Sequence, residues 1–410
     1  MGNIFKLSLF FMLLGNISCS NDEYKFQPYE PEKPVNQEIT LLKYDFSDET
    51  SLNDFSNESN AGNWHLETRG LTVDGTNDAA LYLNLERRIS FEQRATRVRL
   101  SLFSNTRFGL EWIERDGNGG SLFTVDATKG TINIHKYWAG VEDIEASTPF
   151  TIENGHIYLL EAIKSFRNNT FIITDEQTGA TASVETSSVL DSGNGLVRQQ
   201  NEFKGGRQNN VFGFRRISGK SPFIKNTEIV ATVSPEPLMY IIGNSITEGD
   251  HIRETARYGQ VMASWLNGTT VFSGESGSTI EGVIDRITNE IPFIRPKFVM
   301  VTIGTNRLNT RDELVELIEL IRKHGSIPII NHIPVTSDGG SYNTNEIIAA
   351  VCEEMNVASC RFDLATAKDD NLHEQASWLF QSDHIHPTIE GHLAMAKRLF
   401  DIPGILLYTK

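Results

Sequence analysis

Short apolar runs separated by turn signals dominate the first half of the chain. The runs are rich in β-branched and aromatic residues, as in ITLLKYDF, TRVRLSL, TFIITDE and TEIVATV. Turns such as Asp74-Gly75, Lys129-Gly130 and Thr178-Gly179 lie between them, and no helix-period stretch of useful length interrupts them. Regularly spaced short strands of this kind predict an antiparallel β-sandwich over residues 38–233.

The hydrophobic period changes after Ser234-Pro235-Glu236-Pro237. Short apolar runs then alternate with segments in which apolar residues recur every three or four positions. The expected strands are 238–242, 269–273, 298–303, 327–331 and 357–362, and the expected helices are 257–266, 279–291, 311–324, 345–355 and 388–400. Alternating elements predict a parallel sheet with helices on both faces, in a five-stranded flavodoxin-like order, over residues 234–410.

Ser245 follows the expected strand 238–242 at the point where the chain enters a polar loop. Gly243 permits a tight exit, and open α/β sheets bind ligands at the carboxyl ends of their strands. A serine in this place is positioned for nucleophilic chemistry, although it would also serve as a helix cap. The nucleophilic interpretation gains support from candidate partners downstream, namely Gly277, Asn306, Asp383 and His386.

Four blocks in the second half, GNSITEG, ESGST, GTN and DHIH, occur in a fixed order. Together they resemble the blocks of the SGNH (GDSL-type) serine hydrolase superfamily. Asn244 stands where the family usually has aspartate, and Arg307 stands where aspartate usually follows the asparagine. Neither departure removes a catalytic group, so activity is expected. Both departures could alter the pH dependence of the reaction or recruit an acidic group of the substrate.

The resemblance implies Ser-His-Asp catalysis that needs neither a cofactor nor a metal. It makes Ser245 the nucleophile, His386 the base and Asp383 the carboxylate that fixes the imidazole tautomer. The oxyanion hole would consist of the backbone N–H groups of Ser245 and Gly277 and the side-chain amide of Asn306. A capping role for His386 and a turn role for Asn306 are the structural alternatives.

Two further residues are weaker candidates for the substrate pocket. Arg307 reverses a charge beside the expected oxyanion donor Asn306. Trp378, with Leu379 and Phe380, precedes the Asp/His loop and either walls the pocket or belongs to the core.

The first residues resemble a bacterial lipoprotein signal. Lys6 supplies a positive start, the apolar stretch 7–14 is too short to cross a bilayer, and Cys19 would be the lipidated first residue. Asn16 departs from the aliphatic residue that is usual there. The polar, Pro-spaced residues 20–37 predict an extended tether. An exported periplasm-facing or cell-surface lipoprotein, anchored in the outer membrane, is the expectation, with an ordinary secretory signal, an uncleaved anchor or no processing as alternatives.

The run HIYLLEAIKSFRNNTFIITDEQTGATASVE gives the sandwich its resemblance to concanavalin-like or laminin-G-like domains. Such domains often bind glycans, although many only support a neighbouring domain. Trp64, Trp112, Tyr137 and Trp138 are candidates for stacking on sugar rings, and their alternative role is in the core.

Composition narrows the function classes. A length of 410 residues favours two domains, and a formal charge of −16 argues against a nucleic-acid partner. Cys352 and Cys360 either pair or stay buried as free thiols, and no CxxC or Cys/His cluster predicts zinc.

The leading hypothesis is an esterase that removes acetyl groups from an acylated glycan. A lipase, lysophospholipase or thioesterase, and a glycan-binding lipoprotein with a silent hydrolase domain, are the alternatives. The glycan, the acyl position and the oligomeric state stay open.

Overall fold

The structure of the protein, a computed structural model, describes residues 37–56, 62–75, 78–113, 119–138, 141–165, 168–187, 189–191, 197–199 and 211–410. Cys19, the expected signal around it and all but the last residue of the expected tether lie outside these residues. In the described ranges, no helix combines the length and the apolar character that crossing a membrane requires.

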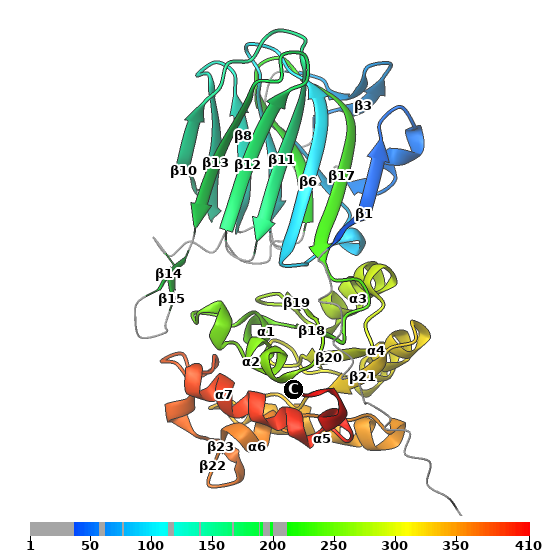
Figure 1. Cartoon of the computed structure of the whole chain (residues 1–410), viewed down its shortest axis with the longest axis vertical. Helices are drawn as coiled ribbons and strands as arrows, with labels where there is room; N and C mark the ends of the chain where they lie inside the picture. The colour runs from blue at the N-terminus through cyan, green and yellow to red at the C-terminus, as the bar shows by residue number, and fades with distance from the viewer. Residues whose placement is uncertain are drawn as a thin grey trace, which may run out of the picture. The chain divides into compact units, whose positions relative to one another are not determined.

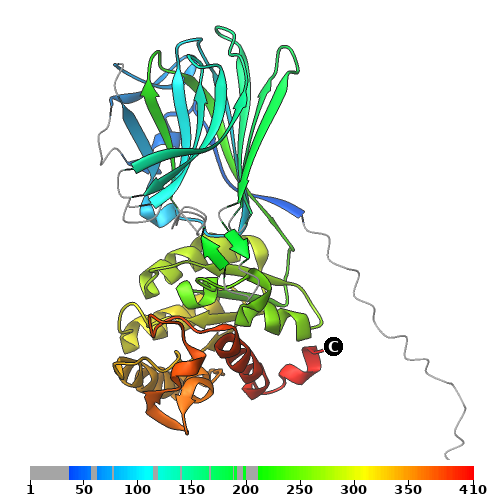
Figure 2. The same ribbon diagram turned by 90° about the vertical axis from the view of Figure 1, so that its left-hand side faces the viewer.

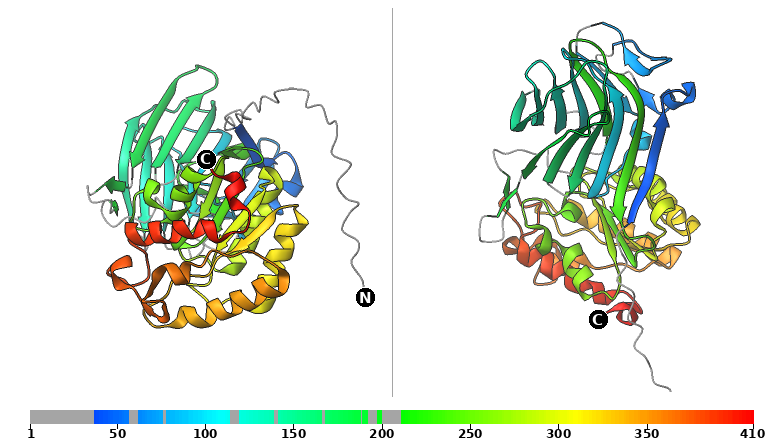
Figure 3. Two further views of the ribbon diagram at one scale, coloured as in Figure 1. Left: turned by 60° about the horizontal axis from the view of Figure 1, so that its bottom comes forward. Right: turned by 45° about the horizontal axis from the view of Figure 1, so that its top comes forward.

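Two antiparallel sheets form the N-terminal half (Figures 1 and 2). The first has the order β13-β12-β11-β6-β17-β4-β3, and β1 also pairs with β17, beside which it lies in the right panel of Figure 3. Its strands are β1 (Gln37–Asp45), β3 (Trp64–Glu67), β4 (Gly70–Val73), β6 (Gln93–Ser101), β11 (Ile157–Ser165), β12 (Asn168–Asp175), β13 (Thr181–Ser187) and β17 (Phe223–Val233).

The second sheet has the order β10-β9-β8-β7-β16-β5-β2. Its strands are β2 (Phe55–Ser56), β5 (Ala79–Leu83), β7 (Arg107–Ile113), β8 (Gly119–Asp126), β9 (Thr131–Trp138), β10 (Val141–Pro149) and β16 (Val211–Ser218). A separate hairpin joins β14 (Val189–Asp191) to β15 (Val197–Gln199), and the 3-10 turns are η1 (Glu49–Leu52) and η2 (Leu85–Arg87).

Alternating inward residues build the core between the two sheets. Tyr158, Leu160 and Ala162 of β11 are fully buried at every second position, as a strand with one covered face requires. Phe123 of β8 and Phe171 of β12 pack with their ring centroids 5.7 Å apart, joining the second sheet to the first. The predicted antiparallel sandwich is confirmed.

Two of the aromatic residues considered for sugar stacking belong to this core. Trp64 and Trp112 are buried, and the ring nitrogen of Trp112 donates a hydrogen bond to Thr96 Oγ1 at 3.1 Å. Their rings are therefore unavailable to a glycan, and the core alternative is right for both. The side chains of Tyr137 and Trp138 lie outside the described part of the chain.

A parallel sheet of order β19-β18-β20-β21 organises the C-terminal half. Its strands are β18 (Met239–Gly243), β19 (Thr270–Gly274), β20 (Phe298–Thr302) and β21 (Ile327–Ile330). The helices are α1 (Ser245–Glu248), α2 (Tyr258–Trp265), α3 (Ile280–Ile294), α4 (Arg311–Lys323), α5 (Gly340–Met355), α6 (Phe362–Thr366) and α7 (Ile389–Lys397). The smaller elements are η4 (Glu254–Ala256), η5 (Ser377–Leu379), η6 (Arg398–Asp401), η7 (Ile405–Tyr408) and the hairpin of β22 (Ala367–Lys368) and β23 (Asn371–Gln375).

Helices cover both faces of this sheet. Because successive residues of a strand point to opposite faces, alternate residues of β18 contact different helices. Tyr240 and Ile242 of β18 share a buried cluster with residues of α3, α4 and α5. Met239 and Ile241 share another buried cluster with residues of α2 and α7. The predicted three-layer α/β architecture is confirmed.

The predicted fifth strand at residues 357–362 is wrong as a regular strand. Ala358 and Arg361 form only isolated parallel bridges to β21 and the residues after it. The side-chain oxygen of Asn331 accepts the N–H of Cys360 at 3.2 Å, where a regular ladder would use a backbone carbonyl. Three helix boundaries also differ by three residues or more. Helix α3 ends at Ile294 rather than at 291, α5 begins five residues earlier than expected, at Gly340, and α7 ends at Lys397 before the turn η6.

Candidate active site

A tight turn between β18 and α1 presents Ser245. Gly243 ends the strand, and a side chain there would come within 2.4 Å of the Thr302 carbonyl, so the close packing of the strands requires glycine. Asn244 caps α1 because its Oδ1 accepts the N–H of Ile246 at 3.1 Å. The residue that departs from the family pattern therefore keeps the capping geometry, and Ser245 is the first residue of the helix.

His386 lies between Ser245 and Asp383. Its Nε2 is 2.9 Å from Ser245 Oγ, and its Nδ1 is 2.7 Å from Asp383 Oδ2. A hydroxyl, an imidazole and a carboxylate that are distant in sequence thus form one continuous hydrogen-bonded line. This arrangement can pass a proton from the serine to the ring while the carboxylate stabilises the charged ring.

The Asp/His loop holds this line through its own backbone. Asp383 Oδ1 accepts the N–H groups of Ile385 and His386 at 2.9 and 3.0 Å, and Gln381 donates its N–H to the His386 carbonyl at 2.8 Å. Thr388 then caps α7 by accepting the N–H of Gly391. The loop therefore fixes both the carboxylate and the ring before the helix begins. His384, the neighbouring histidine, is exposed.

The environment keeps Asp383 ionised. Partial burial acts to raise the pKa of its carboxyl, but hydrogen bonds from the His386 ring and from the N–H groups of His386 and Ile385 outweigh burial and lower the pKa below its usual value. A carboxylate that is charged over the physiological range is the form that favours an imidazolium beside it.

The three expected oxyanion donors come from the ends of neighbouring strands. As the first residue of α1, Ser245 has a backbone N–H with no acceptor within the helix. Gly277 follows β19 with φ +79°, and no atom lies within 4 Å of the position that a Cβ would occupy. Asn306 follows β20, and its Nδ2 donates to the Ser278 carbonyl at 2.9 Å. This bond connects Asn306 to residues 275–279 between β19 and α3, here named the glycine loop.

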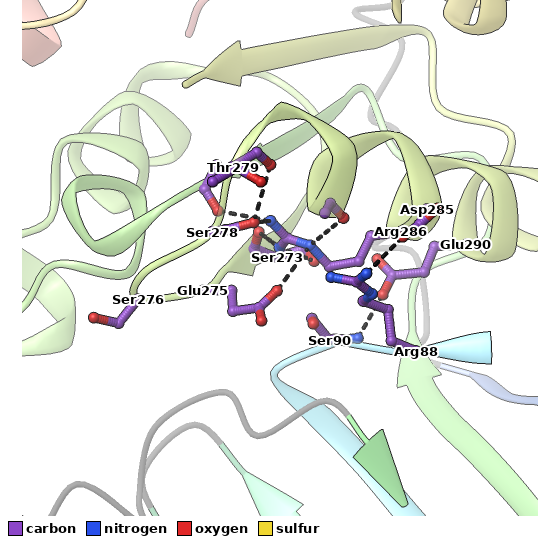
Figure 4. Close-up of polar contacts among 12 residues, drawn as sticks. Arg88, Ser90, Ser273, Glu275, Ser276, Ser278, Thr279, Asp285, Arg286 and Glu290 are labelled. Atoms are coloured by element: carbon purple, nitrogen blue, oxygen red, sulfur yellow. Dashed lines mark hydrogen bonds and ion pairs between the residues drawn. The ribbon is translucent and has the colours of Figure 1, made fainter. Parts of the chain in front are cut away.

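Arg286 of α3 connects the nucleophile turn to the glycine loop, and Figure 4 shows its guanidinium beside Ser273, Glu275 and Ser278. The fully buried guanidinium donates from Nη2 to the Gly243 carbonyl at 2.8 Å and to Ser278 Oγ at 3.0 Å. Its Nε also lies 3.3 Å from Glu275 Oε2. Sequence reasoning missed this residue, and the available signal was a charge between Val283 and Ile287 in a mainly apolar helical stripe.

Asp250 is a second carboxylate beside His386 that sequence reasoning missed. It is 3% exposed, and its Oδ2 lies 3.8 Å from His386 Nε2. Its N–H donates to the Ser245 carbonyl at 3.1 Å, so it belongs to the turn that ends α1. The aspartate at the end of the block GNSITEG-D was the only signal for it in the sequence.

The two weaker pocket candidates take different positions. Arg307 pairs with Glu281 at 2.9 Å and with Glu313, so its charge joins the starts of α3 and α4 and is already balanced. The expectation that it would meet an acidic group of the substrate gains no support from this pairing. Trp378 lies in η5 with 63% of its surface exposed, which excludes the core alternative for it, whereas Phe380 is buried.

Comparisons with solved structures give partial matches to each half. A member of the lipolytic protein G-D-S-L family from Veillonella parvula is 22% identical, with a TM-score of 0.36 over 40% of this chain and 97% of its own. A GDSL-like lipase from Bacteroides thetaiotaomicron is 16% identical, with a TM-score of 0.34 over 40% of this chain and 85% of its own. A carbohydrate binding module from Bacillus subtilis is 12% identical, with a TM-score of 0.29 over 49% of this chain and 96% of its own.

A search of the curated proteins finds no match to this chain. Residues 241–394, which contain Ser245, Gly277, Asn306, Asp383 and His386, match the model of the GDSL-like Lipase/Acylhydrolase family. This match supports an acylhydrolase function. The C-terminal part of the chain is therefore a GDSL-like acylhydrolase domain, in agreement with the resemblance that its four sequence blocks show.

Proposed function

We propose that the protein is a serine esterase that removes short acyl groups, acetyl above all, from an acylated carbohydrate. One observation carries the chemistry: His386 Nε2 is 2.9 Å from Ser245 Oγ, while Asp383 lies at the opposite ring nitrogen. A serine hydroxyl becomes an effective nucleophile only when a base of this kind can take its proton. No cofactor is needed for this reaction.

In the first half of the reaction, Ser245 Oγ attacks the acyl carbonyl carbon while its proton moves to His386 Nε2. The carbonyl oxygen becomes an oxyanion that accepts hydrogen bonds from the N–H groups of Ser245 and Gly277 and from the Asn306 amide. Asn306 Nδ2 has two N–H groups, and the bond to Ser278 uses one of them.

Collapse of this intermediate breaks the ester C–O bond. The protonated His386 gives its proton to the departing sugar oxygen, and the acyl group remains on Ser245. Water then attacks the acyl-enzyme with His386 again acting as base, which releases the carboxylic acid and restores the serine. Asp383 stays ionised throughout and stabilises the imidazolium.

The test combines a covalent probe with a simple ester. A fluorophosphonate should label wild-type protein at Ser245, and p-nitrophenyl acetate should be hydrolysed. Ser245→Ala should abolish both, whereas Ser264→Ala, a change at an exposed serine of α2, should leave both unchanged. Unchanged turnover in the Ser245 variant would refute the role of this residue, and an unlabelled wild type would favour a glycan-binding protein with a silent hydrolase domain.

The carbohydrate part of the proposal rests on the partner domain and the expected export. Sandwich domains accompany many enzymes that act on glycans, and an acidic exported protein suits a neutral acylated polysaccharide. Acetate release from a panel of acetylated polysaccharides is the direct assay. Release from none of them, with turnover of simple esters intact, would reject this substrate class.

A lipase or thioesterase is the second candidate, and exposed apolar residues beside the site favour it. Leu308, two residues after Asn306, is 50% exposed, and Ile385, next to His386, is 43% exposed. Such residues would contact a long acyl chain favourably. A series of p-nitrophenyl esters from acetate to palmitate separates the candidates, because preference for long chains supports the lipase.

We also propose that lipidated Cys19 attaches the protein to a membrane, with the residues up to 37 as a spacer. The charged start, the short apolar stretch and the cysteine support this proposal. Intact-mass measurement on protein from membrane fractions tests it. A soluble, unlipidated product would reject it.

A further inference from the structure

The loop that follows η2 in the sandwich contacts the acylhydrolase domain through several buried polar groups (Figure 4). Arg88 Nη2 donates to Asp285 Oδ2 of α3 at 2.6 Å, and the Ser90 N–H donates to Glu290 Oε1 at 2.6 Å. Asn289 also donates to the Arg88 carbonyl at 3.2 Å. Residues 86–92, here named the docking segment, therefore bond directly to the helix that carries Arg286.

Glu92 links the docking segment to Arg257, the residue before α2. Its two carboxylate oxygens bind the two terminal nitrogens of Arg257, one of them at 3.0 Å. Arg257 is fully buried and Glu92 is 8% exposed. A bidentate pair of this kind fixes the guanidinium in one orientation. Because the pair is buried, removing the Glu92 carboxylate would leave the Arg257 charge uncompensated.

Arg257 in turn holds the turn that follows the nucleophile helix. Its Nη1 lies 3.4 Å from the Glu248 carbonyl, and its side chain packs on Gly249, where a Cβ would come within 2.2 Å of it. The buried Glu248 side chain accepts the Ser276 N–H at 2.8 Å, next to the expected oxyanion donor Gly277. A change at Arg257 should therefore affect both the turn that follows Ser245 and the loop that presents Gly277.

We propose that Glu92, a residue of the β-sandwich, is a positioning residue of the acylhydrolase site. It orients Arg257, which fixes the turn 248–250 and, through Glu248, the loop that presents Gly277. The sandwich is then part of the catalytic apparatus as well as a candidate glycan binder. The inference rests on the proposed function, because positioning is measured through ester hydrolysis.

The experiment measures kcat, KM and the melting temperature of the full chain with p-nitrophenyl acetate. Glu92→Gln should lower kcat about tenfold or more and change KM less than about threefold, because a misplaced oxyanion donor affects the transition state more than binding. Glu111→Gln is the matched control. Glu111 is also buried and pairs with Arg215 within the sandwich, so this variant should lose stability without losing kcat.

A double variant separates positioning from plain stability. Glu92→Gln combined with Arg257→Met removes both charges, so the melting temperature should recover relative to Glu92→Gln alone. The rate should stay low, because the turn still lacks its guanidinium donor. Glu92→Asp, which keeps the charge, should restore part of the rate. If Glu92→Gln fails to fold, these two variants decide the question.

The outcomes distinguish the two proposals. A wild-type chain that neither reacts with a fluorophosphonate nor hydrolyses the ester contradicts the proposed function itself. An active wild type in which Glu92→Gln matches Glu111→Gln in kcat overturns the positioning role. Recovery of kcat together with the melting temperature in the double variant overturns it as well, because the pair would then act on stability alone.

Discussion

Asp250 Oδ2 lies 3.8 Å from His386 Nε2, the same ring nitrogen that faces the Ser245 hydroxyl at 2.9 Å. His386 thus has a carboxylate near each of its ring nitrogens, Asp383 at Nδ1 and Asp250 at Nε2. When the ring takes the serine proton, both negative charges favour the imidazolium. The more buried of the two, Asp250, is 3% exposed and is screened little by solvent.

Replacing Asp250 with asparagine should therefore slow the chemical step. The change keeps the shape of the side chain and removes its charge, so kcat for p-nitrophenyl acetate should fall about tenfold with little change in KM. Asp401→Asn, a change at a carboxylate that pairs with Arg398 in η6, is the control. Full activity in the Asp250 variant would show that this charge has no role in the reaction.

Asn306→Ala should reduce kcat by about 100-fold or more, the usual effect of removing one oxyanion donor. The variant also removes the hydrogen bond to the Ser278 carbonyl. The glycine loop therefore loses one hydrogen bond, and the oxyanion hole loses one donor. Fluorophosphonate labelling at Ser245 should continue at a reduced rate, because Ser245 and His386 are unaffected. Loss of less than about threefold in kcat would exclude Asn306 from the oxyanion hole.

Cys352 and Cys360 are free and buried, which settles the pairing that the sequence left open. Burial raises the pKa of Cys352 to about 12 and also raises the pKa of Cys360, so neither thiol forms the reactive thiolate near neutral pH. A reductant should leave the melting temperature unchanged. In folded protein, iodoacetamide should label these two peptides only slowly, whereas rapid labelling or a disulfide between them in peptide mass spectra would contradict the structure.

The candidate site residues that the sequence singled out share a local signal. Ser245 follows a strand recognisable by its apolar run, and Asp383 stands three positions before His386, so short patterns place them at the same sheet edge. Gly277 and Asn306 also follow strands. These signals survive without knowledge of the tertiary structure, because parallel strands bring their carboxyl ends together.

The residues that the sequence did not reveal depend on partners far along the chain. Glu92 and Arg257 are 165 positions apart, and neither lies in a motif. Arg286 and Asp250 carry charges that look solvent-exposed until tertiary contacts bury them. The prediction of a fifth strand was wrong for a related reason. The Cys360 N–H donates to the Asn331 side chain, whereas the apolar run alone predicts a bond to a backbone carbonyl.

His392 should make the stability of the folded domain fall in acid. The Tyr258 N–H donates to its Nδ1 at 3.1 Å, which requires a neutral ring, and burial together with Arg257 and His386 lowers its pKa to about 3. The unfolded chain binds a proton near pH 6.5, so stability is full above that pH and is lost as pH falls toward 3.

The expected loss attributable to His392 approaches about 1.4 kcal/mol per pH unit below pH 6. His392→Asn keeps an acceptor for the Tyr258 N–H and removes the titration, so the slope of unfolding free energy against pH should decrease by that amount. Urea unfolding between pH 4.5 and 6.5 measures it. His332, whose pKa burial lowers to about 4, remains in the variant and should preserve part of the slope. An unchanged slope in the variant would mean that the His392 ring binds a proton as readily in the folded chain as in the unfolded one.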